Sequence, residues 1–456
     1  MKEHFSRRDF LRTMGVVSSG TLLAACATQA TEEPEEPMEE EPAVPSEDET
    51  VQLTMWHGDW SVWNPHFDGI AQRAFYAGVR PRVDLDAPPM PWNEYWDKVT
   101  ISGEAGVGPE ILYLNYNSYK RLYNAGAMRV IPESVYAIAD IEKDFSVDIL
   151  EPLKVFDGKY YYVPWELHPQ GTVYNKSLLE REGFTEPPSG FDEFLEVAQA
   201  CVKKENDQVV QSGLGMDGPY MFLFTVLLPS IGGEACSPYD ETPDKMRTDE
   251  AAEAFELLAD YEREHDILHP AFSIGVGGWW AGAYLYGKQA FCWWISGANI
   301  TLEEQTLDKG SAITTDNIIP KLGPEGFRVG TRPNWGPSVT TACPEEKLDT
   351  AWKLWKYTLS HEELAAYSNL TLMPSPRISV QEAGREIYPE GPRGDEAVLE
   401  IEAIKQHSFL FGQPENESLW REAFQDTYDG VIGGMTGKEA IEANWSKFQE
   451  GWTGEA

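Results

Sequence analysis

Strand-like and helix-like segments alternate along residues 51–125, and this alternation limits the folds that the chain can adopt. Residues 51–56 alternate apolar with polar side chains, which predicts a strand that ends in a loop at 57–59. The segments that follow are predicted helices at 67–78, 93–103 and 119–125 and predicted strands at 82–85 and 110–114. Alternation at these lengths predicts an α/β fold with a parallel, doubly wound sheet, in which ligands bind beyond the carboxyl ends of the strands.

The first 25 residues have the features of an export signal. A pair of arginines at 7–8 precedes an apolar run at 15–25 that is too short to span a bilayer. The pair resembles a twin-arginine signal, and the small residues before Cys26 resemble the lipobox of bacterial lipoproteins. We therefore expect residues 1–25 to be removed as a signal peptide. Cys26 would carry a lipid that anchors the protein to the cell membrane on its extracytoplasmic side.

An acidic segment separates this signal from the first predicted strand. Residues 27–50 contain ten acids, four prolines and no basic residue. Such a segment cannot bury apolar surface and stays extended, so we expect 26–50 to be the lipidated cysteine followed by a spacer. The whole chain has 36 Lys and Arg against 75 Asp and Glu, a net charge of -39. A surface this negative repels phosphate groups, which argues against nucleic acids and anionic lipid headgroups as partners.

Short motifs recur in a fixed order along the rest of the chain. They are GKYYYVPWE at 158–166, TVYNK at 172–176, a Pro187-Pro188 turn before a predicted helix at 191–204, LYGKQAF at 285–291, IIPKLGP at 318–324, a predicted helix at 347–359 and MPSPR at 373–377. With the lipobox, they resemble the sugar-binding lipoproteins of bacterial ABC importers, the family 1 extracellular solute-binding proteins related to maltose-binding protein. The chain departs from that pattern at Glu110, where the family often has Asp, at 331–335, which replaces a Gly-Gly loop, and after Ser296-Gly297, where no Trp follows.

The resemblance implies a two-lobe fold of the periplasmic-binding-protein type II kind. Each lobe would be a mixed or mostly parallel sheet flanked by helices, and the lobes would close over a ligand by hinge motion. By analogy, lobe 1 comprises 51–163 and 314–367, and lobe 2 comprises 164–313 and 368–456. The chain would cross between the lobes near Val163-Pro164, near Thr314 and near Leu372-Met373.

A carbohydrate has flat C–H faces and a rim of hydroxyls, so its site needs aromatic rings for the faces and planar polar groups for the edges. Predicted loop tips and crossover segments of this chain supply both kinds of side chain. The candidate ligand-binding residues are Trp56, His57, Asp59, Trp60, Asn115, Tyr116, Trp165, Glu166, His168, Trp279, Trp280, Trp294, Asn334, Trp335 and Arg377. For any single tryptophan, packing in the core is an equally good explanation. Trp352 and Trp355, at i and i+3 of a predicted helix, are expected in the core.

These residues lead us to expect a monomeric, lipid-anchored receptor that captures a neutral sugar or oligosaccharide and delivers it to an ABC permease with a separate ATPase. Two alternatives stay open. Aromatic rings near carboxylates also suit a cationic or peptide-like solute through cation–π attraction. Asp59 and Glu166 could equally be the paired carboxylates of a secreted glycoside hydrolase, although the resemblance implies a protein without catalysis.

No cofactor, metal or catalytic residue is expected. His265 and His269 have helical spacing, but Pro270 follows them and neither an HExxH motif nor a third ligand is present. Beyond Cys26, four cysteines remain, which allow three full pairings: Cys201, Cys236, Cys292 and Cys343. Export permits disulfides, but twin-arginine substrates resemble proteins that fold in the reducing cytoplasm, so we expect free, buried thiols.

Overall fold

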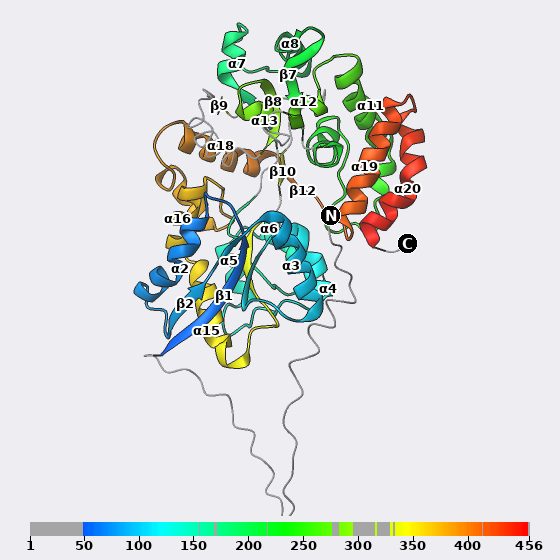
Figure 1. Ribbon diagram of the computed structural model, residues 1–456. Coiled ribbons are helices and arrows are strands. Elements are labelled where there is room, and N and C mark those ends of the chain that lie inside the picture. The colour runs from blue at the N-terminus through cyan, green and yellow to red at the C-terminus, as the bar shows by residue number, and fades with distance from the viewer. Residues whose placement is uncertain are drawn as a thin grey trace, which may run out of the picture. The chain divides into compact units, whose positions relative to one another are not determined.

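The α/β class predicted from the sequence is confirmed by a computed structural model (Figure 1). The structure describes residues 49–154, 156–167, 171–216, 218–275, 282–294, 315–316, 329–331, 333–412 and 414–454. The described strands form two five-stranded sheets and one two-stranded ladder. A large hydrophobic core lies against each five-stranded sheet, which gives the two lobes that the resemblance implied. None of the described helices is both long and apolar enough to cross a membrane.

The sheet of lobe 1 is mostly parallel. Its strands are β1 (Thr50–Gly58), β2 (Arg82–Asp86), β3 (Pro89–Met90), β4 (Ile111–Leu114) and β11 (Gly336–Val339). The order is β11-β4-β1-β2, and β3 also pairs with β1. β1 runs parallel to β2, β3 and β4, whereas β11 is antiparallel to β4. The carboxyl ends of these four parallel strands therefore point toward one edge of the sheet, where an α/β fold binds its ligand.

Helices cover both faces of this sheet. They include α2 (Asn64–Tyr76), α3 (Trp92–Ala105), α4 (Tyr116–Asn124), α5 (Ile138–Asp144), α6 (Val147–Leu150), the 3-10 turn η1 (Glu151–Lys154), α15 (Glu345–Thr358) and α16 (His361–Thr371). In Figure 1, α3 and α4 lie on one side of β1 and α2 and α16 on the other. Trp352 and Trp355 of α15 are buried in this core, as predicted.

The sheet of lobe 2 is mixed. Its strands are β5 (Gly171–Asn175), β6 (Lys203–Glu205), β7 (Gln208–Gly215), β8 (Gln289–Trp294) and β9 (Thr315–Asp316), in the order β6-β7-β8-β5-β9. β7 and β8 are parallel, and the other neighbours are antiparallel. The helical elements of this lobe are α7 (Lys176–Arg181), α8 (Phe191–Ala200), α9 (Pro219–Phe222), the π-helical turn η2 (Leu223–Leu227), α10 (Leu228–Ser230), the 3-10 turn η3 (Asp244–Arg247), α11 (Asp249–Arg263), α12 (Pro270–Gly275), α13 (Gly282–Leu285), α19 (Glu417–Ile432) and α20 (Gly437–Thr453).

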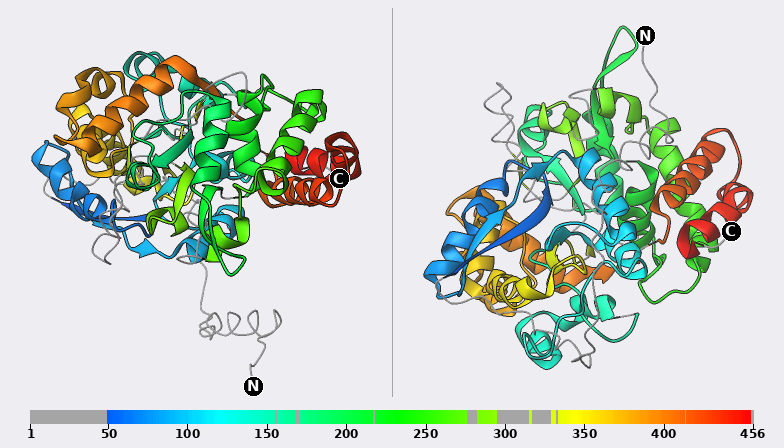
Figure 2. Two further views of the ribbon diagram at one scale, coloured as in Figure 1. Left: turned by 90° about the horizontal axis from the view of Figure 1, so that it is seen from above. Right: turned by 60° about the horizontal axis from the view of Figure 1, so that its bottom comes forward.

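The last two helices pack side by side, as Figures 1 and 2 show in orange-red and red. Their aromatic residues contribute to the core of lobe 2, where the ring centroid of Trp420 lies 5.3 Å from that of Phe448 and 5.1 Å from that of Trp452.

The segment between lobe 1 and α19 consists of α17 (Ile378–Ala383), the 3-10 turn η4 (Gly384–Glu386), α18 (Pro392–His407) and β12 (Ser408–Leu410), which pairs with β10 (Val329–Thr331).

One predicted helix is wrong at its end. The helix expected at 191–204 stops at Ala200, and β6 and β7 form a hairpin beyond it. Asn206 and Asp207 make the turn of this hairpin with φ angles of 51° and 62°. Two consecutive residues in the left-handed region favour the tight turn that matches strand twist, so this local preference overrides the helical periodicity.

The crossover segments hydrogen-bond to one another. The backbone N–H of Trp165 donates to the carbonyl of Trp335 at 2.7 Å, and that of Leu167 donates to the carbonyl of Pro374 at 2.7 Å. Gly336 makes the first approach close, because a Cβ on it would lie 2.4 Å from the Val163 carbonyl oxygen. Three segments that are distant in the sequence are therefore held together by backbone contacts.

The second and third crossovers lie later in the chain than predicted. β9, at 315–316, pairs with β5 in the lobe 2 sheet, so the second crossover follows Asp316 rather than preceding Thr315. The third crossover lies beyond residue 368, because α16 runs to Thr371 and Val380 still belongs to the core of lobe 1. The chain re-enters the core of lobe 2 at Phe411. The motifs that suggested these boundaries mark turns, whereas strand pairing and core contacts decide the lobe.

The four cysteines that remain after Cys26 are buried and form no disulfide with one another, as predicted. Burial raises the pKa of the Cys201 and Cys343 thiols to about 12, so both stay protonated at neutral pH.

Candidate functional site

Four tryptophans meet at the carboxyl edge of the lobe 1 sheet. We call Trp60, Trp63, Trp92 and Trp335 the tryptophan cluster. The ring centroid of Trp63 lies 4.8 Å from that of Trp60, 5.8 Å from that of Trp92 and 5.5 Å from that of Trp335. Trp63 is buried and Trp335 is 8% exposed, whereas Trp60 and Trp92 are half-buried. Trp60 and Trp92 therefore present ring surface to solvent, and Trp63 supports both.

The end of β1 positions this cluster. The indole N–H of Trp63 donates to the carbonyl of Gly58 at 3.0 Å, and the backbone N–H of Asp59 donates to the carbonyl of Met90 at 2.7 Å. The Asn64 side chain donates to the Asp59 carboxylate at 2.7 Å and accepts from the backbone N–H of Trp60 at 3.3 Å. The loop after β1 is thus ordered by its own polar groups, which leaves Asp59 exposed beside the rings.

Gly58 makes room for Trp92. A Cβ at this position would lie 2.2 Å from Cζ3 of the Trp92 ring, so the ring packs directly on the glycine backbone. We expect Gly58→Ala to displace the Trp92 indole and to lower the free energy of unfolding by about 1–3 kcal/mol, the usual cost of overpacking. Near-ultraviolet circular dichroism and urea denaturation measure the two effects. Gly275→Ala, whose Cβ meets open space, should change neither, and an unchanged Gly58→Ala spectrum would contradict this packing.

Trp56 and His57 lie away from the cluster. β1 extends to Gly58, so Trp56 pairs with Leu112 inside the sheet, and its side chain lines a cavity of about 20 Å³ beneath α3. The His57 ring stacks on Phe67 at 4.1 Å, and its Nδ1 and Nε2 lie 2.9 and 3.0 Å from the carbonyls of Gly58 and Ala87. Burial lowers the pKa of His57 despite these two hydrogen bonds, so the ring is neutral at neutral pH and packs in the interior.

Asn115 and Tyr116 also have structural roles. The Asn115 side chain accepts from the backbone N–H of Ser118 at 3.1 Å and caps the first turn of α4. Tyr116 is 3% exposed and belongs to the core of lobe 1.

Trp165, Glu166 and Asn334 lie in the crossovers. The Trp165 ring is completely buried, with its centroid 5.0 Å from that of Tyr113 and 5.2 Å from that of Tyr367. The Glu166 carboxylate, 1% exposed, accepts from the Asn334 side-chain amide at 2.8 Å and from the Tyr367 hydroxyl at 2.6 Å. These contacts tie the first crossover to the second and to α16.

Arg377 holds the third crossover to lobe 1. Its guanidinium donates to the carbonyl of Leu359 at 2.8 Å, lies 3.5 Å from the Asp144 carboxylate and stands 5.2 Å over the Phe145 ring.

The ring of Trp294, at the end of β8, is outside the described residues, as are His168, Trp279, Trp280 and the lipidation candidate Cys26. The structure therefore brings Asp59, Trp60 and Trp335 together at one edge, with Trp63 and Trp92.

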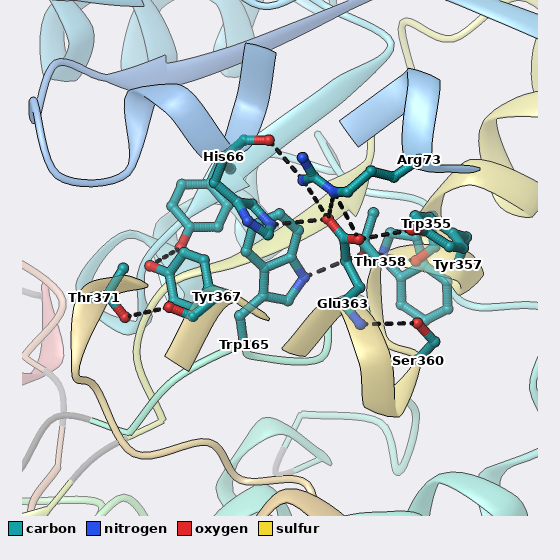
Figure 3. Close-up of polar contacts among 11 residues, drawn as sticks. His66, Arg73, Trp165, Trp355, Tyr357, Thr358, Ser360, Glu363, Tyr367 and Thr371 are labelled. Atoms are coloured by element: carbon teal, nitrogen blue, oxygen red, sulfur yellow. Dashed lines mark hydrogen bonds and ion pairs between the residues drawn. The ribbon is translucent and has the colours of Figure 1, made fainter. Parts of the chain in front are cut away.

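A buried ionic group joins α2, α15 and α16 of lobe 1 (Figure 3). The Glu363 carboxylate of α16, 2% exposed, lies 2.6 Å from Nη2 of Arg73 and 3.0 Å from Nε2 of His66, both on α2, and accepts from the Tyr357 hydroxyl at 2.7 Å. Burial would raise the pKa of Glu363, but hydrogen bonds from His66 and Arg73 outweigh burial and lower it to about 2. We call these four residues the Glu363 network.

Sequence reasoning missed Trp63, Trp92 and the Glu363 network. Trp92 follows Pro88-Pro89-Met90-Pro91, directly after the second strand, so its place at the carboxyl end of a strand was a usable signal. Trp63 lies five residues beyond the end of β1 and offered the same signal. No pattern links Arg73 to Glu363, which are 290 residues apart.

Comparison with known proteins gives a consistent picture. A model for bacterial extracellular solute-binding proteins matches residues 82–390. A Brucella abortus protein described as a binding protein is 27% identical over 154 residues, 34% of this chain, and the match spans only 36% of that relative's length. The diacetylchitobiose binding protein DasA of Streptomyces coelicolor is 23% identical over 322 residues, 68% of this chain and 69% of the relative. An ABC substrate-binding protein of Listeria monocytogenes in complex with cycloalternan has the same fold, with a TM-score of 0.69 at 16% identity over 88% of this chain and 98% of that one.

Proposed function

Because the chain belongs to the family of bacterial extracellular solute-binding proteins, we propose that it captures a neutral sugar or oligosaccharide and delivers it to the permease of an ABC importer. The family binds solutes and is not a family of enzymes. The observation that best supports a sugar is the pair of half-buried rings, Trp60 and Trp92, held beside the exposed Asp59 carboxylate at the carboxyl edge of the lobe 1 sheet.

The chemistry of this edge suits a carbohydrate. An indole ring offers a flat apolar face to the C–H groups of a pyranose, and a carboxylate accepts hydrogen bonds from its hydroxyls. In our proposal Trp60 and Trp92 stack on the sugar, Asp59 binds a hydroxyl, and Trp335 supports the rings. His168, Trp279, Trp280 and Trp294 would supply the contacts from lobe 2.

The names of two similar proteins favour the same solute class. DasA is named for diacetylchitobiose, and the Listeria protein was solved with cycloalternan, so both relatives are associated with oligosaccharides. A hydrolase has less support, because the two oxygens of Glu166 are bonded to Asn334 and Tyr367 and only 1% of the residue is exposed. A catalytic acid needs access to its substrate.

The proposal also includes the mode of attachment. The paired arginines, the small residues before Cys26 and the acidic spacer at 27–50 favour export through the twin-arginine route followed by lipidation of Cys26. The receptor would then work as a monomer on the extracytoplasmic side of the membrane. Radiolabelled palmitate incorporation that is lost in Cys26→Ser tests this part independently of the solute.

A binding screen tests the solute class. We expect maltotriose, diacetylchitobiose or a related oligosaccharide to raise the melting temperature, because a ligand that binds only the folded state stabilises it. Choline, spermidine and a tripeptide should have no effect. If only choline and spermidine raised the melting temperature, the solute would be a cation and the sugar proposal would be wrong.

Trp92→Ala then tests the site. Removal of a ring that stacks on the solute should cost about 1.5–3 kcal/mol of binding free energy, which weakens affinity roughly 10- to 150-fold in calorimetric titration. Trp445→Ala is a matched control, because Trp445 lies on α20 beneath the Arg247 guanidinium at 4.8 Å and away from the cluster. Equal affinities of Trp92→Ala and the unchanged protein would exclude Trp92 from the site.

A further inference from the structure

We propose that Glu415 is an affinity-determining latch that links the two lobes without touching the solute. Glu415 lies in lobe 2, two residues before α19, and its carboxylate contacts α4 of lobe 1. One oxygen lies 2.9 Å from Nζ of Lys120, and the other accepts from the Asn124 side-chain amide at 2.6 Å. A single carboxylate thus uses both oxygens to join elements of different lobes.

Lobe 2 holds Glu415 in place by backbone contacts. The N–H of Glu415 donates to the carbonyl of Trp452 at 3.2 Å, and the N–H of Asn416 donates to the carbonyl of Gly451 at 2.9 Å. Gly454 packs against the Glu415 side chain, since a Cβ on Gly454 would lie 2.5 Å from Cγ of Glu415. The carboxylate is therefore presented to lobe 1 from α20 and the start of α19, and little conformational freedom is lost when it binds α4.

Two cavities adjoin the latch. A cavity of about 610 Å³ is lined by Ser118 and Arg121 of lobe 1 together with Glu417 and Arg421 of lobe 2. A second cavity, of about 240 Å³, is lined by residues of both lobes that include Lys120 and Tyr239. Close packing between the lobes is therefore interrupted near the Glu415 contacts.

The latch lies on the side of the molecule opposite α16 and α18. Figure 1 shows α4, α19 and α20 on one side and α16 and α18 on the other. Glu415 lies four residues beyond Phe411, where the chain re-enters the lobe 2 core, and its partners Lys120 and Asn124 lie on α4 of lobe 1. A hinge rotation that moves α4 away from the start of α19 would break the Lys120–Glu415–Asn124 contacts, so they are made only while these two elements are close together.

A contact made in only one lobe arrangement shifts the population toward that arrangement and raises the apparent affinity for a solute that binds it. The side chains of Lys120 and Glu415 are 27% and 22% exposed, so their ion pair is weakened but not abolished by solvent. We expect Glu415→Gln to weaken solute affinity about two- to fivefold. The inference rests on the proposed function, because a latch changes affinity only in a protein that closes over its solute.

Distance measurement without any solute tests the latch directly. Cysteines introduced at Tyr76 of lobe 1 and Met435 of lobe 2, which are 77% and 49% exposed, accept a fluorescent donor and acceptor, whereas Cys201, Cys236, Cys292 and Cys343 are buried. Glu415→Gln and Lys120→Met should each shift the donor–acceptor distance distribution, measured by fluorescence energy transfer, to longer distances. The double variant should shift it no further than either single variant. Glu417→Gln is the control, because Glu417 pairs with Arg421 within α19 at 2.8 Å.

The outcomes separate this inference from the proposed function. The latch is overturned if Glu415→Gln and the unchanged protein give the same distance distribution, or if Glu417→Gln produces an equal shift. Titration with maltotriose and diacetylchitobiose is then carried out on the same labelled proteins. If Glu415→Gln shifted the distance distribution but no variant responded to either sugar, the latch would be supported and the proposal that the solute is a sugar would be contradicted.

Discussion

Glu363→Ala should destabilise the protein by about 3 kcal/mol, among the largest losses that a single side chain of lobe 1 can cause. Removal of one partner from a buried ionic network typically costs about 3–5 kcal/mol, because the other charge loses its compensation. We expect the lower end of this range, because the Arg73 side chain is 36% exposed and water solvates its charge once the Glu363 carboxylate is removed. Urea denaturation measures the loss as a change in the free energy of unfolding.

Glu362→Ala provides the control on the same helix. Glu362 is exposed and adjacent to Glu363, so its removal should change the free energy of unfolding by less than about 0.5 kcal/mol. Equal effects of the two substitutions would mean that the Glu363 network does not stabilise the fold.

The same network predicts an acid-dependent loss of stability. The pKa of Glu363 is lowered from 4.5 to about 2 in the folded protein, so between these pH values the unfolded chain binds more protons than the folded one. The contribution of Glu363 is complete above pH 4.5 and declines as the pH falls toward 2. In Glu363→Gln this decline should be smaller, and the difference from the unchanged protein should narrow on acidification. A difference that stays constant between these pH values would contradict the lowered pKa.

Gly336→Ala should also cost about 3 kcal/mol, at the upper end of the range for overpacking. A Cβ at this position would lie 2.4 Å from the Val163 carbonyl oxygen and 2.7 Å from Cα of Pro164. Both are backbone atoms of the first crossover, and neither can rotate away as a flexible side chain can. We expect the Trp165–Trp335 backbone hydrogen bond to lengthen and the melting temperature to fall by several degrees.

Gly190→Ala is the matched control for this prediction. A Cβ on Gly190 meets nothing within 4 Å, and its extended backbone suits any residue. If Gly336→Ala melted at the same temperature as Gly190→Ala, the two crossovers would not be in contact as described.

Much of lobe 1 could be predicted because its sequence signals are local. The first strand was predicted at 51–56 and is found at Thr50–Gly58, since alternating apolar residues mark a strand whatever surrounds it. The predicted helix at 93–103 lies within Trp92–Ala105 for the same reason. The helix expected at 191–204 failed where Asn206 and Asp207 formed a turn, because a short hairpin competes with the end of a helix.

The site was harder to predict, because residue type alone does not determine burial. Trp60 and Trp165 both follow predicted strand or crossover segments, yet Trp60 is half-buried at the sheet edge and Trp165 is enclosed by Tyr113 and Tyr367. Glu166 and Asp59 are both carboxylates next to a Trp, but only Asp59 is exposed. The two partners that enclose Glu166 are distant in the chain, since Asn334 lies 168 residues and Tyr367 of α16 lies 201 residues beyond it.

The sequence by itself determined the α/β class, the two-lobe family and the presence of aromatic and acidic residues at strand ends, because strand and helix periodicity and short motifs act over a few neighbouring residues. Only the tertiary structure decided which tryptophans reach solvent and which carboxylates are bonded internally. Arg73 with Glu363 and Lys120 with Glu415 are pairs separated by about 290 residues. The first pair forms only when lobe 1 folds, and the second only when the two lobes come together. Burial and partner choice depend on these distant contacts, so the same residue types are exposed at one position and buried as internal support at another.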